Sequence, residues 1–157
     1  MNSRSFVLSA VIAGAGIGLL GNLPLLNLIN CFLCLWVWVG GVVAVYLYRH
    51  FQAGGASLTA AQGAGLGALA GLIGAFVGVV VYAATSFISM PLFMNVAQFF
   101  ELEGDLPFAT VEPSSILGSA FVFFVLDAIL YPLFGAISGF IKTSLLAKQS
   151  AVPGQTS

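Results

Sequence analysis

Charged residues are the scarcest feature of this chain. Only 6% of its 157 residues are Asp, Glu, Lys or Arg, and the mean hydropathy is +1.10. A water-soluble globular domain of this length needs a larger polar surface, so the composition excludes that class. The chain also lacks a basic patch that would neutralise a phosphate backbone, which argues against nucleic acid as a partner.

Cysteine and histidine are scarce too, with two and one residues. A haem held by two histidines is therefore excluded. A four-ligand zinc site within one chain is excluded as well, because His50 is predicted at the membrane face opposite the two cysteines. No phosphate-binding loop, serine-hydrolase elbow or zinc-protease motif occurs. The sequence predicts no cofactor, no metal and no enzyme activity.

The chain is rich instead in long apolar runs. Each run is long enough to cross a bilayer, which takes ~20 helical residues. The predicted organisation is a single membrane domain over residues 1–148, with spans over 6–24, 31–48, 60–85 and 115–141, an outer loop over 86–114 and a disordered tail over 149–157. Thr59 is placed to cap the third span. A short interfacial helix is expected over 92–102, because polar residues recur there every third position.

The N-terminus allows a second interpretation. Arg4 followed by the apolar stretch 6–20 is also the pattern of a secretory signal. However, residues 21–24 lead into more apolar sequence instead of a small-x-small cleavage site and a polar chain. A cleaved signal would leave three spans, and the charge pattern would then fit less well.

The few charges fall into two groups along the chain. Four acids lie together between the third and fourth spans: Glu101, Glu103, Asp105 and Glu112. The basic residues flank the other ends of the spans: Arg4, Arg49, Lys142 and Lys148. Four crossings place all the basic residues on one side, which the positive-inside rule assigns to the cytoplasm. We therefore predict a multi-pass protein of the bacterial inner membrane with both termini cytoplasmic.

Glycine is abundant, and it lies mostly inside the apolar runs. Several glycines recur every four residues, which places them on one helix face where two backbones can approach closely. The predicted packing positions are Gly14, Gly18, Gly63, Gly67, Gly71, Gly74, Gly78, Gly135 and Gly139. These faces pack either within one four-helix bundle or between copies and against a larger complex. The likeness of residues 14–18 to 63–67 also allows a duplicated helical hairpin.

Asp127 is the one ionisable residue deep within a predicted span. An aspartate near the bilayer centre suggests function by default, and apolar surroundings favour its neutral form. Tyr131, one turn on, is placed to exchange a hydrogen bond with it, and Pro132 leaves the Ala128 carbonyl without its helical donor. A structural Asp127 would bond to that carbonyl or to Ser9. A functional Asp127 would bind a proton or a cation.

Cys31 and Cys34 stand one turn apart at the predicted outer start of the second span. A redox or metal role is one interpretation of this spacing at an oxidising face. The other is two small apolar residues of a helix, which the absence of a second cysteine pair and of a βαβ unit favours. The spacing of the acidic loop matches no calcium-binding loop, so we expect a solvated loop there.

Two stretches resemble known families. Gly-Gly-x-x-Ala-x-Tyr-x-Tyr-Arg over residues 40–49, preceded by Pro24, two asparagines and two cysteines, resembles a pattern in small bacterial four-span membrane proteins without known activity. Residues 63–71 followed by Asp127 and Pro132 are similar to the rotor-ring subunit of rotary ATP synthases. That likeness implies that Asp127 is an ion-binding carboxylate. The chain departs from that family by two preceding helices and by a long acidic connection in place of a short polar loop.

Together these patterns predict an all-α integral membrane four-helix bundle with glycine-rich packing faces. The leading functional prediction is a non-enzymatic membrane component, either a small homo-oligomer or an accessory subunit of a larger complex in the lipid bilayer. The alternative is a small proton- or cation-coupled transporter or channel that uses Asp127.

Overall fold

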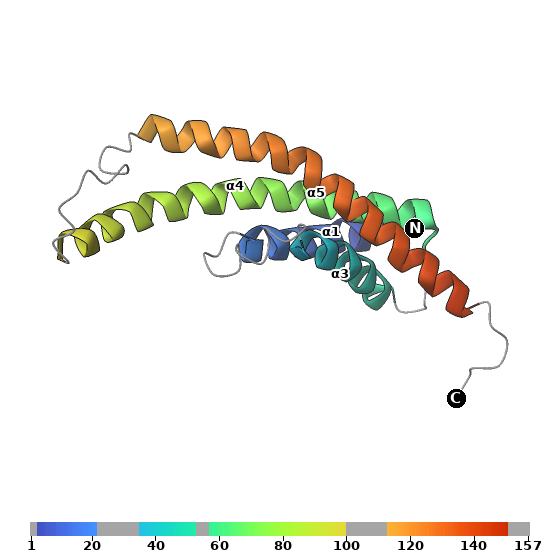
Figure 1. Cartoon of the computed structure of the whole chain (residues 1–157). Helices are drawn as coiled ribbons and strands as arrows, with labels where there is room; N and C mark the ends of the chain where they lie inside the picture. Colours follow the sequence, from blue (N-terminus) through green and yellow to red (C-terminus); the bar gives the residue numbers. More distant parts are fainter. Residues whose placement is uncertain (1–2, 22–34, 53–56, 100–112, 151–157) are drawn as a thin grey trace.

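The computed structural model describes residues 3–21, 35–52, 57–99 and 113–150, with side chains for all of these except 87–99, 113–116, 119 and 150. The described residues form four helices: α1 (Ser3–Gly21), α3 (Leu35–Phe51), α4 (Ala60–Phe99) and α5 (Pro113–Ser150). The described part of the chain contains no strand, which confirms the all-α prediction. Figure 1 shows α4 and α5 as a long pair with the shorter α1 and α3 beside it.

Three of the helices are long and apolar enough to cross a membrane, namely Ser3–Gly21, Ala60–Ser86 within α4 and Ala120–Gln149 within α5. The fourth helix, α3, has 17 described residues. Its predicted start at residues 31–34 lies outside the described part of the chain. The helices are therefore consistent with a membrane protein, and the number of crossings and their direction stay predictions.

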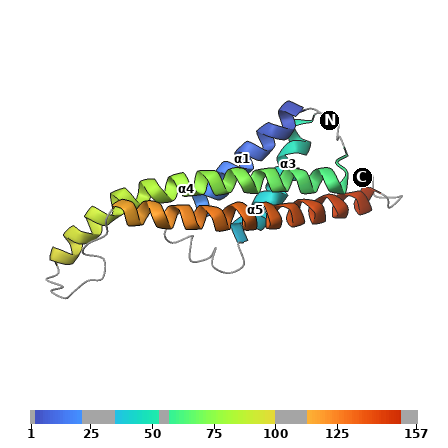
Figure 2. The ribbon, with the colours of Figure 1, turned by 90° about the horizontal axis from the view of Figure 1, so that it is seen from above.

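The helices form two unequal layers. α4 packs along α5, and α1 and α3 pack against that pair near the end where α4 begins and α5 ends. α3 contacts all three other helices, whereas α1 contacts only α3 and α4 among the described elements. Figure 2 shows the resulting shape from above: α4 and α5 extend together well beyond α1 and α3.

Thr59 caps α4, as its place in the sequence predicts. The N–H of Gln62 donates to Thr59 Oγ1 at 3.3 Å, and the N–H of Thr59 donates to Gln62 Oε1 at 3.0 Å. This reciprocal pair is a capping box, which satisfies backbone donors that a helix start leaves unpaired. The start of α4 is thus fixed by two side chains.

α4 continues further than expected. It is one helix through Phe99, so residues 86–99 of the predicted outer loop are helical, and the described part of the expected interfacial helix is the end of α4. Pro91 lies within this helix. Proline removes one backbone hydrogen bond, but in a long apolar helix it is tolerated within the element.

α5 also exceeds its predicted bounds. It begins at Pro113 and ends at Ser150, so Gln149 and Ser150, which were expected in a disordered tail, are helical. The residues before them, Leu145–Lys148, are strong helix formers without a glycine stop, so the helix continues. The rest of the predicted tail, residues 151–157, lies outside the described part of the chain.

Many buried positions hold small side chains, beside larger ones such as Tyr48 and Leu66, whereas many large apolar side chains lie on the exterior. Ala10, Ala44, Ala70 and Ala75 are fully buried, whereas Phe121 on α5 is 67% exposed. A soluble protein rarely exposes so many large apolar side chains, but a bilayer solvates them. In lipid the hydrophobic effect does not favour helix association, so close packing has to stabilise it. Small residues at the contacts let helices approach closely.

Candidate functional site

The contact between α4 and α5 runs through small residues spaced four apart. The facing pairs are Gly63 with Gly139, Gly67 with Gly135, and Gly71 with Tyr131. A Cβ added at any of these glycines would meet backbone atoms of the opposite helix; at Gly63 it would lie 2.7 Å from the Gly139 carbonyl oxygen. Backbone atoms cannot move aside as a flexible side chain can. Only hydrogen therefore fits at these positions.

A second close contact joins α1 to α4, which run parallel. A Cβ added at Gly14 would lie 2.6 Å from the Ala70 carbonyl oxygen. One added at Gly18 would lie 2.8 Å from the Gly74 carbonyl oxygen and 2.8 Å from the Gly78 nitrogen. Eight of the nine glycines that the spacing singles out therefore face another helix of the same chain, and the nitrogen of the ninth, Gly78, lies against Gly18.

Two further contact glycines lie on α3, and the sequence analysis missed them. A Cβ at Gly41 would lie 2.7 Å from the Gly135 carbonyl oxygen, and one at Gly40 would collide with the Ile17 side chain. Gly40 and Gly41 do not recur at a spacing of four; they are adjacent and contact two different neighbouring helices. Two consecutive glycines inside an apolar run were the available signal.

Other glycines face outward. A Cβ added at Gly16, Gly65 or Gly118 would meet nothing within 4 Å. Gly65 lies between Gly63 and Gly67 along the chain, yet on the opposite side of α4. The difference shows that helix phase, and not glycine content, decides which positions touch a neighbour.

Asp127 lies half-buried on α5, one turn before the buried Tyr131. The pairing of 63 with 139, 67 with 135 and 71 with 131 advances by four on each helix. Its next step sets the fully buried Ala75 opposite Asp127. The side chain therefore stands at the continuation of the glycine contact, where α4 offers an apolar surface.

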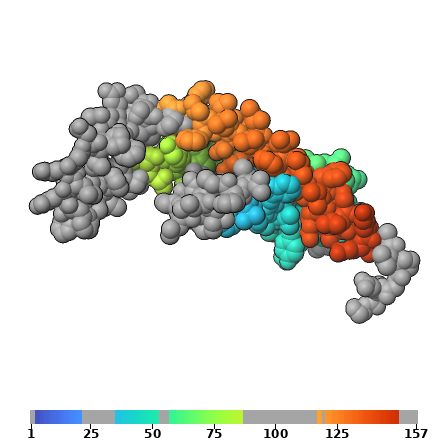
Figure 3. Space-filling view, in the orientation of Figure 1, coloured from blue at the N-terminus to red at the C-terminus, as the bar shows by residue number. Residues whose placement is uncertain are grey.

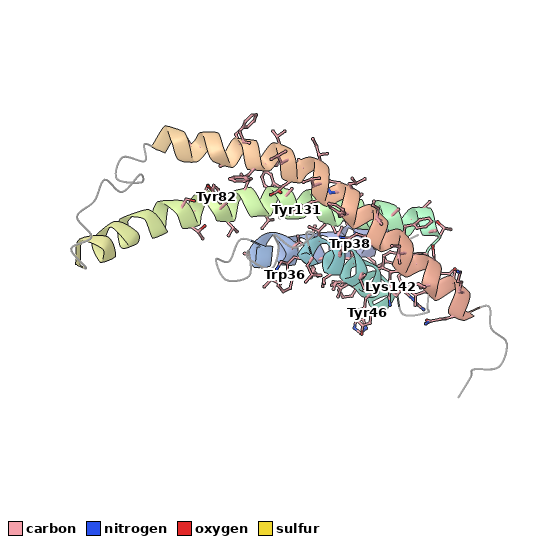
Figure 4. All side chains as sticks on the ribbon, in the orientation of Figure 1. Trp36, Trp38, Tyr46, Tyr82, Tyr131 and Lys142 are labelled. Carbon is pink, nitrogen blue, oxygen red and sulfur yellow. The ribbon has the colours of Figure 1, made fainter. Side chains whose placement is uncertain are left out.

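No described side chain forms a hydrogen bond or an ion pair with Asp127. The proposed bond to Ser9 is wrong, because the Ser9 hydroxyl donates to the Ser5 carbonyl at 2.7 Å and α1 does not contact α5. Tyr131 lies one turn further along α5 and is buried, as Figure 4 shows at the contact with α4. Its backbone carbonyl, together with Pro132, is the surface that Gly71 meets.

Several predicted positions lie outside the described residues: Cys31, Cys34, Glu101, Glu103, Asp105 and Glu112. Their redox, metal-binding or calcium-binding interpretations therefore stay predictions. In the described part of the chain no group of three or more His, Cys, Asp or Glu side chains is gathered as a metal site.

Comparison of the chain with protein-family models, with curated proteins and with solved structures finds no match in any of the three. The two resemblances drawn from the sequence stay predictions.

Proposed function

We propose that this protein is a non-enzymatic component of a membrane, a bundle of four crossing helices whose glycine faces hold its own helices together. The observation that supports this most directly is where small and large side chains lie. Glycine and alanine occupy helix contacts, and many large apolar side chains lie on the outside. In lipid, close backbone approach gains van der Waals contact that bulkier residues would prevent. The glycine faces are then occupied within one chain.

Association with further copies or with a larger complex must therefore use another surface. Of the three long apolar helices, α1 has 44% of its membrane-length stretch buried inside the chain, α4 has 39%, and α5 only 17%. Figure 3 shows α5, orange to red, uncovered along the visible face. We propose the outer face of α5 as the surface through which the component assembles.

The mass of the intact assembly in mild detergent tests this proposal. We expect a mass above that of the 16.2 kDa chain, and a shift toward the single chain when Ile129 and Leu133 on α5 are both replaced by alanine. Phe76→Ala on α4 is the matched control, because Phe76 is 62% exposed and Ile129 is 63% exposed. A single-chain mass for the unchanged protein would contradict assembly through α5.

A second candidate function is ion handling at Asp127, favoured by the absence of a described partner for this half-buried acid. A structural acid in an apolar contact is normally hydrogen-bonded, since an unpaired polar group is costly there. An acid that binds and releases a proton or a cation needs an uncommitted carboxyl group. The rotor-ring likeness assigns Asp127 the same role.

Labelling with a hydrophobic carbodiimide, which attacks neutral carboxyl groups, tests that role without a known substrate. We expect a labelled mass that is lost in Asp127→Asn and suppressed when a cation such as Na⁺ is raised, because a bound cation excludes the neutral form. Asn is nearly isosteric with Asp, so the variant should keep its detergent stability. Labelling that no cation suppresses would contradict ion binding at Asp127 and favour a packing role for this residue.

A further inference from the structure

A pocket of about 290 Å³ opens where the end of α3, the residues before α4 and the last turns of α5 meet. Its floor includes the buried side chains of Val45, Leu58 and Thr143. The Thr143 hydroxyl already donates to the Gly139 carbonyl at 2.7 Å, so the floor offers no free hydroxyl proton and is otherwise apolar.

The mouth of this pocket differs from its floor. It includes the exposed residues Arg49, Ser57 and Ala147. A guanidinium with five N–H donors and a serine hydroxyl therefore stand over an apolar floor. The pocket is amphipathic, with its polar part directed to the outside.

The pocket lies at the end of the molecule that gathers the basic residues, here called the basic end. The Phe6 and Tyr48 rings contact each other with centroids 6.0 Å apart, which brings the start of α1, with Arg4, to the end of α3. Arg49 and Ala147 share the pocket, which brings the end of α3 to the end of α5, where Lys148 follows. Figure 4 shows Lys142 and Tyr46 on this side of α5 and α3.

Among the described residues, Asp127 is the only carboxylate side chain, and it lies far from Arg49 along the chain. Four of the five acids fall between residues 101 and 112, in the connection between the far ends of α4 and α5. The fifth, Asp127, precedes Thr143 by 16 helical positions, or about 24 Å along α5. Within the described part of the chain no carboxylate side chain lines the pocket with Arg49, so the site suits an anion from outside the protein.

The geometry points to a binding site for the phosphate headgroup of an anionic phospholipid. The Arg49 guanidinium would bind the phosphate oxygens, since planar paired N–H donors match their geometry. The apolar floor would cover the first methylenes of the lipid. The volume is at the low end for ligand pockets, which suits a headgroup whose acyl chains remain in the bilayer.

This inference rests on the proposed embedding of the protein in a membrane, with the basic end at the cytoplasmic surface where anionic lipids lie. The full-length protein is purified in mild detergent with phosphatidylglycerol or phosphatidylcholine, and retained lipid is counted by native mass spectrometry. We expect retention of phosphatidylglycerol above phosphatidylcholine. Arg49→Gln should reduce that retention at least about fivefold, because the charge-assisted hydrogen bonds from the guanidinium to the phosphate are lost.

Two further variants distinguish lipid binding in the pocket from a general attraction of anionic lipid to the positive charge of the basic end. Lys148→Gln removes the same charge from the same end but does not line the pocket, so it should change retention by less than about twofold. Ala147→Phe keeps every charge and fills the mouth, so it should lose the lipid as Arg49→Gln does. Thermal unfolding in detergent checks that each variant is folded.

Three results would overturn the lipid site: equal retention of the two lipids, equal loss in Lys148→Gln and Arg49→Gln, or displacement of the lipid by millimolar inorganic phosphate. The last would mean that the pocket takes a free anion. Release of the protein from membranes by alkaline carbonate would instead contradict the proposed embedding, so the two failures are distinguishable.

Discussion

Gly65 and Gly67, two positions apart on α4, lie in opposite surroundings. A Cβ at Gly67 would collide with the Gly135 backbone, whereas one at Gly65 would meet nothing within 4 Å. The same substitution therefore has opposite consequences at the two sites. Comparing the same substitution at the two positions therefore separates the effect of close helix contact from the effect of glycine on helix stability.

We predict that Gly67→Ala lowers the free energy of unfolding by about 1–3 kcal/mol, the usual cost of overpacking. Gly65→Ala should raise it by up to about 1 kcal/mol, because alanine is the better helix former and the site is open. Denaturant unfolding followed by circular dichroism in mild detergent measures both. Equal effects of the two substitutions would show that α4 and α5 do not touch at Gly67.

Sequence reasoning reached these positions through helix geometry alone. Residues four apart share a face, so Gly63, Gly67 and Gly71 had to lie together, with Gly65 on the other side. Spacing carries no information about which helix comes to lie against a face. The supposed bond between Asp127 and Ser9 failed for that reason, since α1 packs on α4 and leaves α5 untouched.

At the scale of the helices, starts were easier to predict than ends. Two side chains determine where α4 starts. Thr59 and Gln62 each accept a hydrogen bond from the backbone N–H of the other residue. The end of α4 has no such signal within residues 86–91, and the helix passes through Pro91 to Phe99. No glycine occurs over residues 86–99 to end the helix, so the helix continues past the predicted boundary.

Removal of the Thr59 hydroxyl tests the capping box. We predict that Thr59→Ala lowers the free energy of unfolding by about 1 kcal/mol, because the Gln62 N–H loses its acceptor. Thr59→Ser keeps a hydroxyl and should stay within a few tenths of a kcal/mol of the unchanged protein. The same denaturant titration compares the two. If serine costs as much as alanine, the methyl group and not the hydroxyl matters there.

For the whole molecule, the most informative property is where charge is placed. Phe6 contacts Tyr48, 42 positions further along the chain, and Arg49 shares a pocket with Ala147, 98 positions further along. These contacts bring distant regions of the sequence to one end of the molecule. The sequence could predict this gathering, because an even number of crossings returns every second loop to the same side. The lipid-sized pocket there could not be predicted, since it depends on how three helix ends meet.

The direction of crossing is tested by single cysteines at the two ends, in a background in which Cys31 and Cys34 are replaced by alanine. Ser57→Cys marks the basic end, where Ser57 is exposed, and Gly104→Cys marks the connection between α4 and α5. The positive-inside rule places the basic end in the cytoplasm. In intact cells an impermeant thiol reagent should therefore label Cys at 104 and leave Cys at 57 unlabelled until the membrane is opened. Labelling only at 57 would mean that the protein crosses in the reverse direction, and labelling at both before opening would mean that it does not separate two compartments.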